Sequence, residues 1–96
     1  MAKKILVVDD EKEFVNTISA RLEPMGYEII PAYNGQEALD KATSEMPDLI
    51  ILDIMMPGMD GLEVLHKLRD NPKTFPLNVI MLTAKGETEY LSLIHI

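Results

Sequence analysis

Cysteine is absent from these 96 residues, and its absence excludes disulfide bonds, thiolate metal sites and cysteine nucleophiles. Positive charge is scarce as well, because nine Lys and Arg stand against sixteen Asp and Glu and give a net charge of -7. A nucleic-acid-binding surface needs clustered basic residues to meet the phosphates, so the composition argues against direct nucleic-acid binding. The acidic balance is instead typical of a protein that attracts cations and basic partner surfaces.

The sequence also lacks a long apolar run, and no stretch is long enough to span a bilayer. The basic start, Met1 to Lys4, is followed only by the short apolar run Ile5–Val8 and then by acidic residues, which is too short for a signal sequence. We therefore expect no membrane association and a cytoplasmic location. The length allows one domain, and an apolar content of 47% is that of a globular chain.

Apolar strand-like runs alternate with amphipathic helical stretches along the chain. Strands are predicted over residues 4–8, 27–31, 49–52 and 78–82, helices over residues 11–22, 35–45 and 62–70, and a loop over residues 55–61. Asn34 with Glu37, and Asp60 with Glu63, have the spacing of capping boxes at helix starts. The connections are long enough for right-handed crossovers, so the order predicts an α/β domain with a parallel sheet.

Three acidic side chains follow two of the apolar runs. Asp9 and Asp10 come after Ile5–Val8, and Asp53 comes after Leu49–Leu52. At the carboxyl ends of neighbouring parallel strands they would converge in the crevice where open α/β sheets bind ligands. Clustered carboxylates repel one another, and a hard divalent cation that prefers oxygen, such as Mg2+, relieves this repulsion. The sequence therefore predicts a metal-dependent phosphate site.

Three segments of the chain resemble the receiver domain of two-component response regulators. Residues 5–11 are similar to the acidic-pair segment, residues 52–61 to the phosphoacceptor segment and its loop, and residues 79–84 to the segment with the switch threonine. The resemblance extends from about Lys3 to Tyr90. It implies a doubly wound, flavodoxin-like α/β fold with strand order 2-1-3-4-5.

The resemblance also implies roles for individual residues. A sensor histidine kinase or a phosphotransfer protein would donate a phosphoryl group to Asp53, so the domain would be a phosphoacceptor and at most catalyse its own phosphorylation and dephosphorylation. Thr83 would contact the phosphate and act as a switch, and the backbone amide of Ala84 would assist it. The implied Mg2+ ligands are Asp9, Asp10, Asp53 and the backbone carbonyl of Met55.

The chain departs from the family in its last third. Receivers carry a phosphate-pairing lysine near the end of a fifth strand, and this chain has none; Lys85 follows Thr83 too closely to take that role. The fifth strand and the last helix are also missing from the pattern, so we expect the fourth strand to form an open edge. Residues 91–96 read Leu-Ser-Leu-Ile-His-Ile, which a transposon-type sequencing adapter also encodes. We therefore expect an incomplete receiver domain over residues 1–90, a non-native tail over residues 91–96, and no effector domain in this chain.

Two other functions stay open at this point. One is a receiver-like fragment that binds Mg2+ but is not stably phosphorylated, because it has no lysine to hold the phosphate. The other is a phosphotransferase or phosphatase with an aspartyl-phosphate intermediate. Dehalogenase-type phosphatases have a second Asp two residues after the first, and here that position is Met55, which counts against them.

Overall fold

Strands and helices alternate along the chain, as its hydrophobic pattern predicts. The computed structural model describes residues 2–82 and 93–95. Its elements, in chain order, are β1 (Lys4–Val8), α1 (Lys12–Leu22), η1 (Glu23–Met25), β2 (Glu28–Ala32), α2 (Gly35–Glu45), β3 (Leu49–Asp53), α3 (Gly61–Asp70), β4 (Val79–Leu82) and β5 (Leu93–His95). No helix among these residues is both long and apolar enough to cross a membrane.

The sheet has the order β2-β1-β3-β4-β5. β1 pairs in parallel with β2 on one side and with β3 on the other, and β3 pairs in parallel with β4. The predicted order 2-1-3-4 of a doubly wound parallel sheet is confirmed. Successive connections wind outward in opposite directions from the β1–β3 pair, which makes this pair the topological switch point where such sheets bind ligands.

The outer edge of β4 is covered, so the prediction of an open edge is wrong. β5 pairs with β4 in the antiparallel direction, with Leu93 opposite Leu82 and His95 opposite Ile80. An exposed row of backbone N–H and C=O groups accepts a strand that runs in either direction. β5 is therefore a short antiparallel addition and differs in direction from a fifth strand that would continue the parallel sheet.

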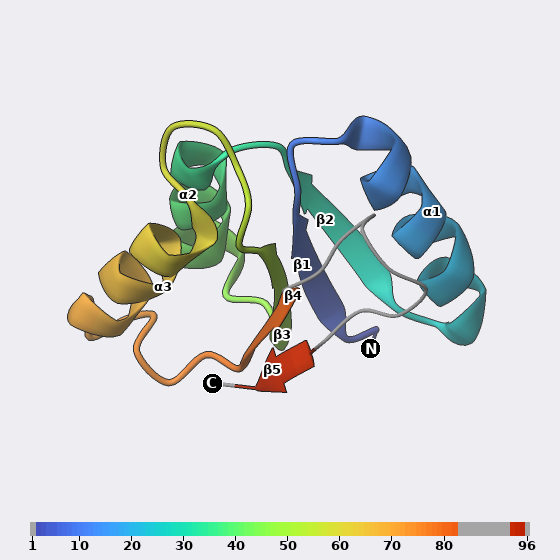
Figure 1. The fold of residues 1–96 in the computed structure, drawn as a ribbon. Helices are drawn as coiled ribbons and strands as arrows, with labels where there is room; N and C mark the ends of the chain where they lie inside the picture. Colours follow the sequence, from blue (N-terminus) through green and yellow to red (C-terminus); the bar gives the residue numbers. More distant parts are fainter. Residues whose placement is uncertain (1, 83–92, 96) are drawn as a thin grey trace.

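Helices cover the two faces of the sheet unequally. α2 and α3 lie on one face, and α1 lies on the other (Figure 1). The larger buried cluster packs under α2 and α3 and includes Leu52, Val64 and Leu68, all at most 1% exposed. Among the described residues, the α1 face holds a smaller cluster with only Ile5, Val7 and Val15 fully inside it. Most of the burial that stabilises the fold is therefore on the α2–α3 side.

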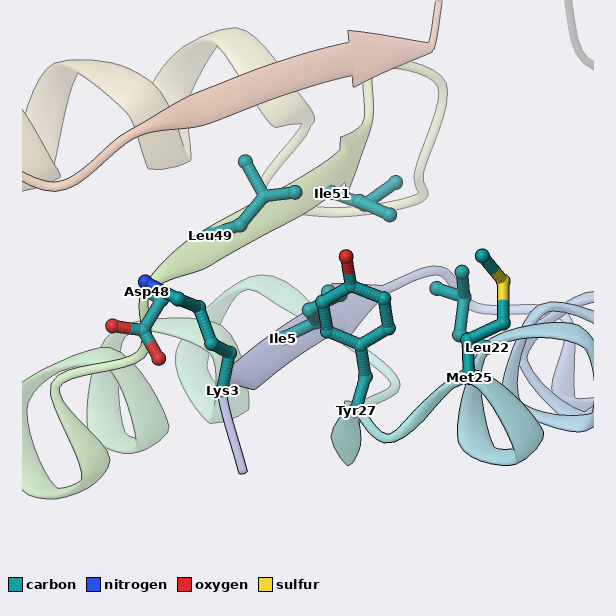
Figure 2. Close-up of a pocket in the computed structure, with 8 residues that line it drawn as sticks. All are labelled: Lys3, Ile5, Leu22, Met25, Tyr27, Asp48, Leu49 and Ile51. Carbon is teal, nitrogen blue, oxygen red and sulfur yellow. The ribbon is translucent and has the colours of Figure 1, made fainter. Parts of the chain in front are cut away.

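The α1 face contains two apolar hollows. One has a volume of about 380 Å³, and Tyr27 lies across it from Leu49 and Ile51 of β3 (Figure 2). The other, of about 270 Å³, lies between α1 and the strands β3 and β4. Leu22 and Ile51 line both hollows, so the two are neighbours beside α1.

The N-cap bond of each predicted capping box is present. The side chain of Asn34 accepts a hydrogen bond from the amide of Glu37 (2.9 Å), and the side chain of Asp60 accepts one from the amide of Glu63 (2.9 Å). Each bond satisfies a backbone donor that the first turn of a helix leaves without a partner. The cap at Asp60 fixes the start of α3, and with it the end of the loop that follows β3.

Candidate functional site

The three acidic residues converge at the carboxyl end of the sheet. In the β1–β3 pair Val8 lies opposite Leu52, so Asp9 and Asp53 leave the pair side by side. Asp53 is the last residue of β3 and lies opposite Leu82 of β4. The parallel register thus brings together carboxylates that are far apart in the sequence, as predicted from the two apolar runs.

The carboxylates form a compact cluster. One oxygen from each of Asp9, Asp10 and Asp53 lies within 4.8 Å of the others. Asp9 and Asp53 are both 0% exposed, whereas Asp10 is exposed at the mouth of the site. Asp9 Oδ1 accepts a hydrogen bond from the amide of Glu11 (2.8 Å), and the amide of Asp9 donates to the carbonyl of Ala32 in β2 (3.0 Å). These bonds hold the first carboxylate at the junction of β1, β2 and α1.

This donor set fits a hard divalent cation. Two buried carboxylates beside a third concentrate negative charge where water cannot screen it, which is unfavourable unless a positive charge compensates it. Carboxylate oxygens are the ligands that Mg2+ prefers, and the exposed side of the cluster leaves room for the waters that Mg2+ retains. The cluster is therefore suited to hold Mg2+ and to present it to an anionic ligand.

The other predicted site residues fall partly within the described chain. Met55 lies next to the cluster, and its amide donates a hydrogen bond to Asp53 Oδ1 (3.1 Å). Its side chain is 72% exposed and takes no part in the core. The role of its carbonyl as a metal ligand stays a prediction. Thr83 and Ala84, the predicted phosphate contacts, lie outside the described residues, as does Lys85.

Gly61, which the sequence pattern places at the end of a loop, lies against the site. Gly61 begins α3, and its amide donates to the carbonyl of Ile54 (3.0 Å), the residue directly after Asp53. A glycine after Pro57 and Gly58 reads as loop punctuation in the sequence. Only the folded backbone shows that the end of this loop is bonded to the residue after Asp53, beside the acidic cluster.

Comparison with known proteins identifies the family. A family model described as the response regulator receiver domain matches residues 5–93. The chain belongs to this family. The receiver domain is 53% identical over 87 residues to the alkaline phosphatase synthesis transcriptional regulatory protein PhoP of Bacillus subtilis, an alignment that covers 91% of this chain. It spans only 35% of that relative's length.

Solved structures agree with the receiver fold. The N-terminal domain of a response regulator receiver protein from Methanoculleus marisnigri superposes with a TM-score of 0.83 at 44% identity, over 90% of this chain and 70% of that one. The chemotaxis protein CheY4 of Vibrio cholerae gives a TM-score of 0.83 at 35% identity, over 93% of this chain and 74% of that one. The receiver domain described here thus shares its fold with these solved structures.

Proposed function

We propose that this receiver domain accepts a phosphoryl group on the carboxylate of Asp53, in a reaction that requires Mg2+. The observation that carries the proposal is the cluster itself: Asp53 ends β3, is 0% exposed, and has carboxylate neighbours whose oxygens lie within 4.8 Å. The family supports the same assignment. We propose further that Asp9, Asp10, Asp53 and the carbonyl of Met55 hold the metal, and that Thr83 and the Ala84 amide contact the phosphate.

The chemistry is a transfer of a phosphoryl group between two nucleophiles. A carboxylate oxygen of Asp53 attacks the phosphorus of a phosphohistidine, the N–P bond breaks, and its electron pair returns to the imidazole as the acyl phosphate forms. The amide of Met55, bonded to Asp53 Oδ1 at 3.1 Å, orients the carboxylate for this attack. When bound, Mg2+ neutralises charge that would otherwise repel the anionic donor.

The partner in this reaction would be a sensor histidine kinase or a phosphotransfer protein. The acidic surface, with a net charge of -7, favours a basic docking face on that partner. The Bacillus subtilis relative is named as a transcriptional regulatory protein, so we propose that phosphorylation of this domain also serves a regulatory output. No output domain is among these 96 residues, and a cytoplasmic location stays a prediction from the sequence.

The test is phosphorylation of the 96-residue chain by a small phosphodonor such as acetyl phosphate, followed by intact-protein mass spectrometry. We expect a mass increase of one phosphoryl group that needs Mg2+, maps to Asp53, and disappears in Asp53→Asn. Asp48→Asn is a matched control, because it removes a carboxylate at the opposite end of β3, where Asp48 accepts a hydrogen bond from the amide of Lys4.

The same experiment separates the alternatives. Mg2+ binding without a detectable acyl phosphate would support a binding-only module, which the lack of a phosphate-pairing lysine makes the main rival. Steady release of phosphate from small phosphoesters, lost in Asp53→Asn, would indicate a phosphatase instead. An unmodified chain that also fails to bind Mg2+ contradicts the proposal outright.

We also propose that residues 91–96 are a non-native tail that follows an incomplete receiver domain at residues 1–90. The pairing of Leu93–His95 with β4 is compatible with this origin, because pairing at a sheet edge relies on backbone groups that every sequence supplies. Reading the native locus through these codons tests the proposal. Finding all six residues encoded there would refute it.

A further inference from the structure

The loop after the phosphoacceptor returns to the backbone of Asp53. The amide of Gly61, which is buried, donates to the carbonyl of Ile54 over 3.0 Å. The amide of Ile54 in turn donates to the carbonyl of Leu82 in β4 over 3.3 Å. The backbone of Ile54, the residue after Asp53, is therefore fixed from two sides, by β4 and by the first residue of α3.

No side chain fits at Gly61. A Cβ atom built on it would overlap the carbonyl oxygen of Asp53, and would lie 2.7 Å from Ile54 Cα and 3.0 Å from the carbonyl carbon of Asp53. All three neighbours are backbone atoms, so none can rotate away as the end of a long side chain does. Glycine is needed here for close approach of two backbone segments.

We propose that Gly61 is a positioning residue for the phosphoacceptor. Its bare Cα lets α3 begin in contact with the Asp53 backbone, and this contact sets where the Asp53 carboxylate lies relative to Asp9 and Asp10. The inference rests on the proposed function, because it explains how the reactive carboxylate is held. Alignment of reacting groups is sensitive to small displacements, and a shift of about 1 Å can reduce a rate by roughly two orders of magnitude.

Gly35 offers a matched comparison. It is also buried and is also the first residue of its helix, α2. The three atoms nearest to a Cβ built on Gly35 all belong to the side chain of Met59: Sδ at 2.7 Å, Cβ at 2.8 Å and Cγ at 2.9 Å. The Sδ and Cγ atoms of Met59 can rotate away, but its Cβ is fixed to the backbone, so Gly35→Ala must displace the loop at Met59. Gly35→Ala therefore presses on the same loop as Gly61→Ala but leaves the backbone of Asp53 untouched.

The experiment compares Gly61→Ala with Gly35→Ala in the 96-residue chain. Urea unfolding gives the stability of each variant, calorimetry gives its Mg2+ affinity, and acetyl phosphate at saturating Mg2+ gives its phosphorylation rate. We expect Gly61→Ala to lower the phosphorylation rate by about tenfold or more relative to Gly35→Ala, and to weaken Mg2+ binding, beyond any shared loss of stability. A folded Gly61→Ala with the rate and affinity of Gly35→Ala overturns the inference.

A measurement on the unmodified chain decides the matter if Gly61→Ala does not fold. Mg2+ binding at Asp53 should shift the amide resonance of Gly61 and slow its hydrogen exchange, whereas the amide of Gly35 should change little. An unaffected Gly61 amide at saturating Mg2+ refutes the coupling. The two proposals can fail separately. A wild-type chain that binds Mg2+ but is never phosphorylated would contradict the proposed function. A selective loss of Mg2+ affinity in Gly61→Ala would still support the positioning role of Gly61.

Discussion

Replacing Asp9 with Asn should stabilise the metal-free domain and weaken the stabilising effect of Mg2+. Two carboxylate charges 4.8 Å apart, the outer limit in the cluster, repel each other by about 3 kcal/mol at an effective dielectric constant of about 20. Asn keeps the oxygen that accepts the Glu11 amide at 2.8 Å, so the loop after β1 retains its anchor. We expect Asp9→Asn to raise the free energy of unfolding by roughly 1–3 kcal/mol in EDTA. The gain is smaller than the full repulsion because backbone amides stabilise the charges of Asp9 and Asp53, and because water around the exposed Asp10 screens its charge.

Adding Mg2+ should reverse this order. An ion that binds only the folded state stabilises it by about 2.7 kcal/mol when its free concentration is roughly 100 times Kd. The variant lacks one of the carboxylates that we propose as Mg2+ ligands, so its Kd should be higher. If Asp9 is a ligand as proposed, the wild-type chain should therefore gain far more stability from Mg2+ than the variant. Urea unfolding followed by circular dichroism, with EDTA and with Mg2+, measures both differences.

The matched control is Glu28→Gln, which removes the same charge from an exposed position of β2. Its effect on stability should be small and independent of Mg2+, because exposed charges are screened by solvent. If Asp9→Asn in EDTA is less stable than the wild-type chain while Glu28→Gln is unchanged, the three carboxylates do not repel one another as argued. The assignment of this cluster as a cation site would then lose its physical basis.

Two further predictions concern stability alone. Leu68→Ala shortens a side chain of α3 that is 1% exposed, and should lower the free energy of unfolding by about 2–5 kcal/mol, measured by urea denaturation. A loss below about 1 kcal/mol would contradict the packing described for this face. Met46→Gly should raise the free energy of unfolding by about 1 kcal/mol, because Met46 ends α2 in the left-handed conformation, with φ of 46°, which glycine adopts without strain. Its side chain is 46% exposed, so little packing is lost. A lower melting temperature for the variant would show that the Met46 side chain contributes more than its backbone conformation costs.

Much of the parallel sheet could be predicted from the sequence. The runs Ile5–Val8 and Leu49–Leu52 are apolar without interruption, as strands buried on both faces require, and both lie within strands of the structure. Because parallel strands end at one edge, the acids that follow these runs had to meet there. Asp9 and Asp53 do meet, and their near-complete burial is a consequence of the same apolar runs.

Two features could not be predicted from pattern alone. The direction of β5 depends on the free edge of β4 and the path of the chain, and a strand as short as Leu93–His95 carries no pattern that specifies direction. The contact of Gly61 with the Asp53 backbone is a property of two segments in space, whereas the sequence shows only a glycine before a helix. Both features depend on tertiary structure, which local propensity does not encode.

The antiparallel β5 has one more consequence, which concerns competition for a place in the sheet. β4 has a single outer edge, and Ile80, Met81 and Leu82 already pair there with residues 93–95. Any strand that pairs directly with β4 on this side, from the same polypeptide or from another molecule, must first displace β5. Residues 93–95 therefore block this edge. Deleting them should expose the backbone N–H and C=O groups of β4, with which a longer strand could then pair.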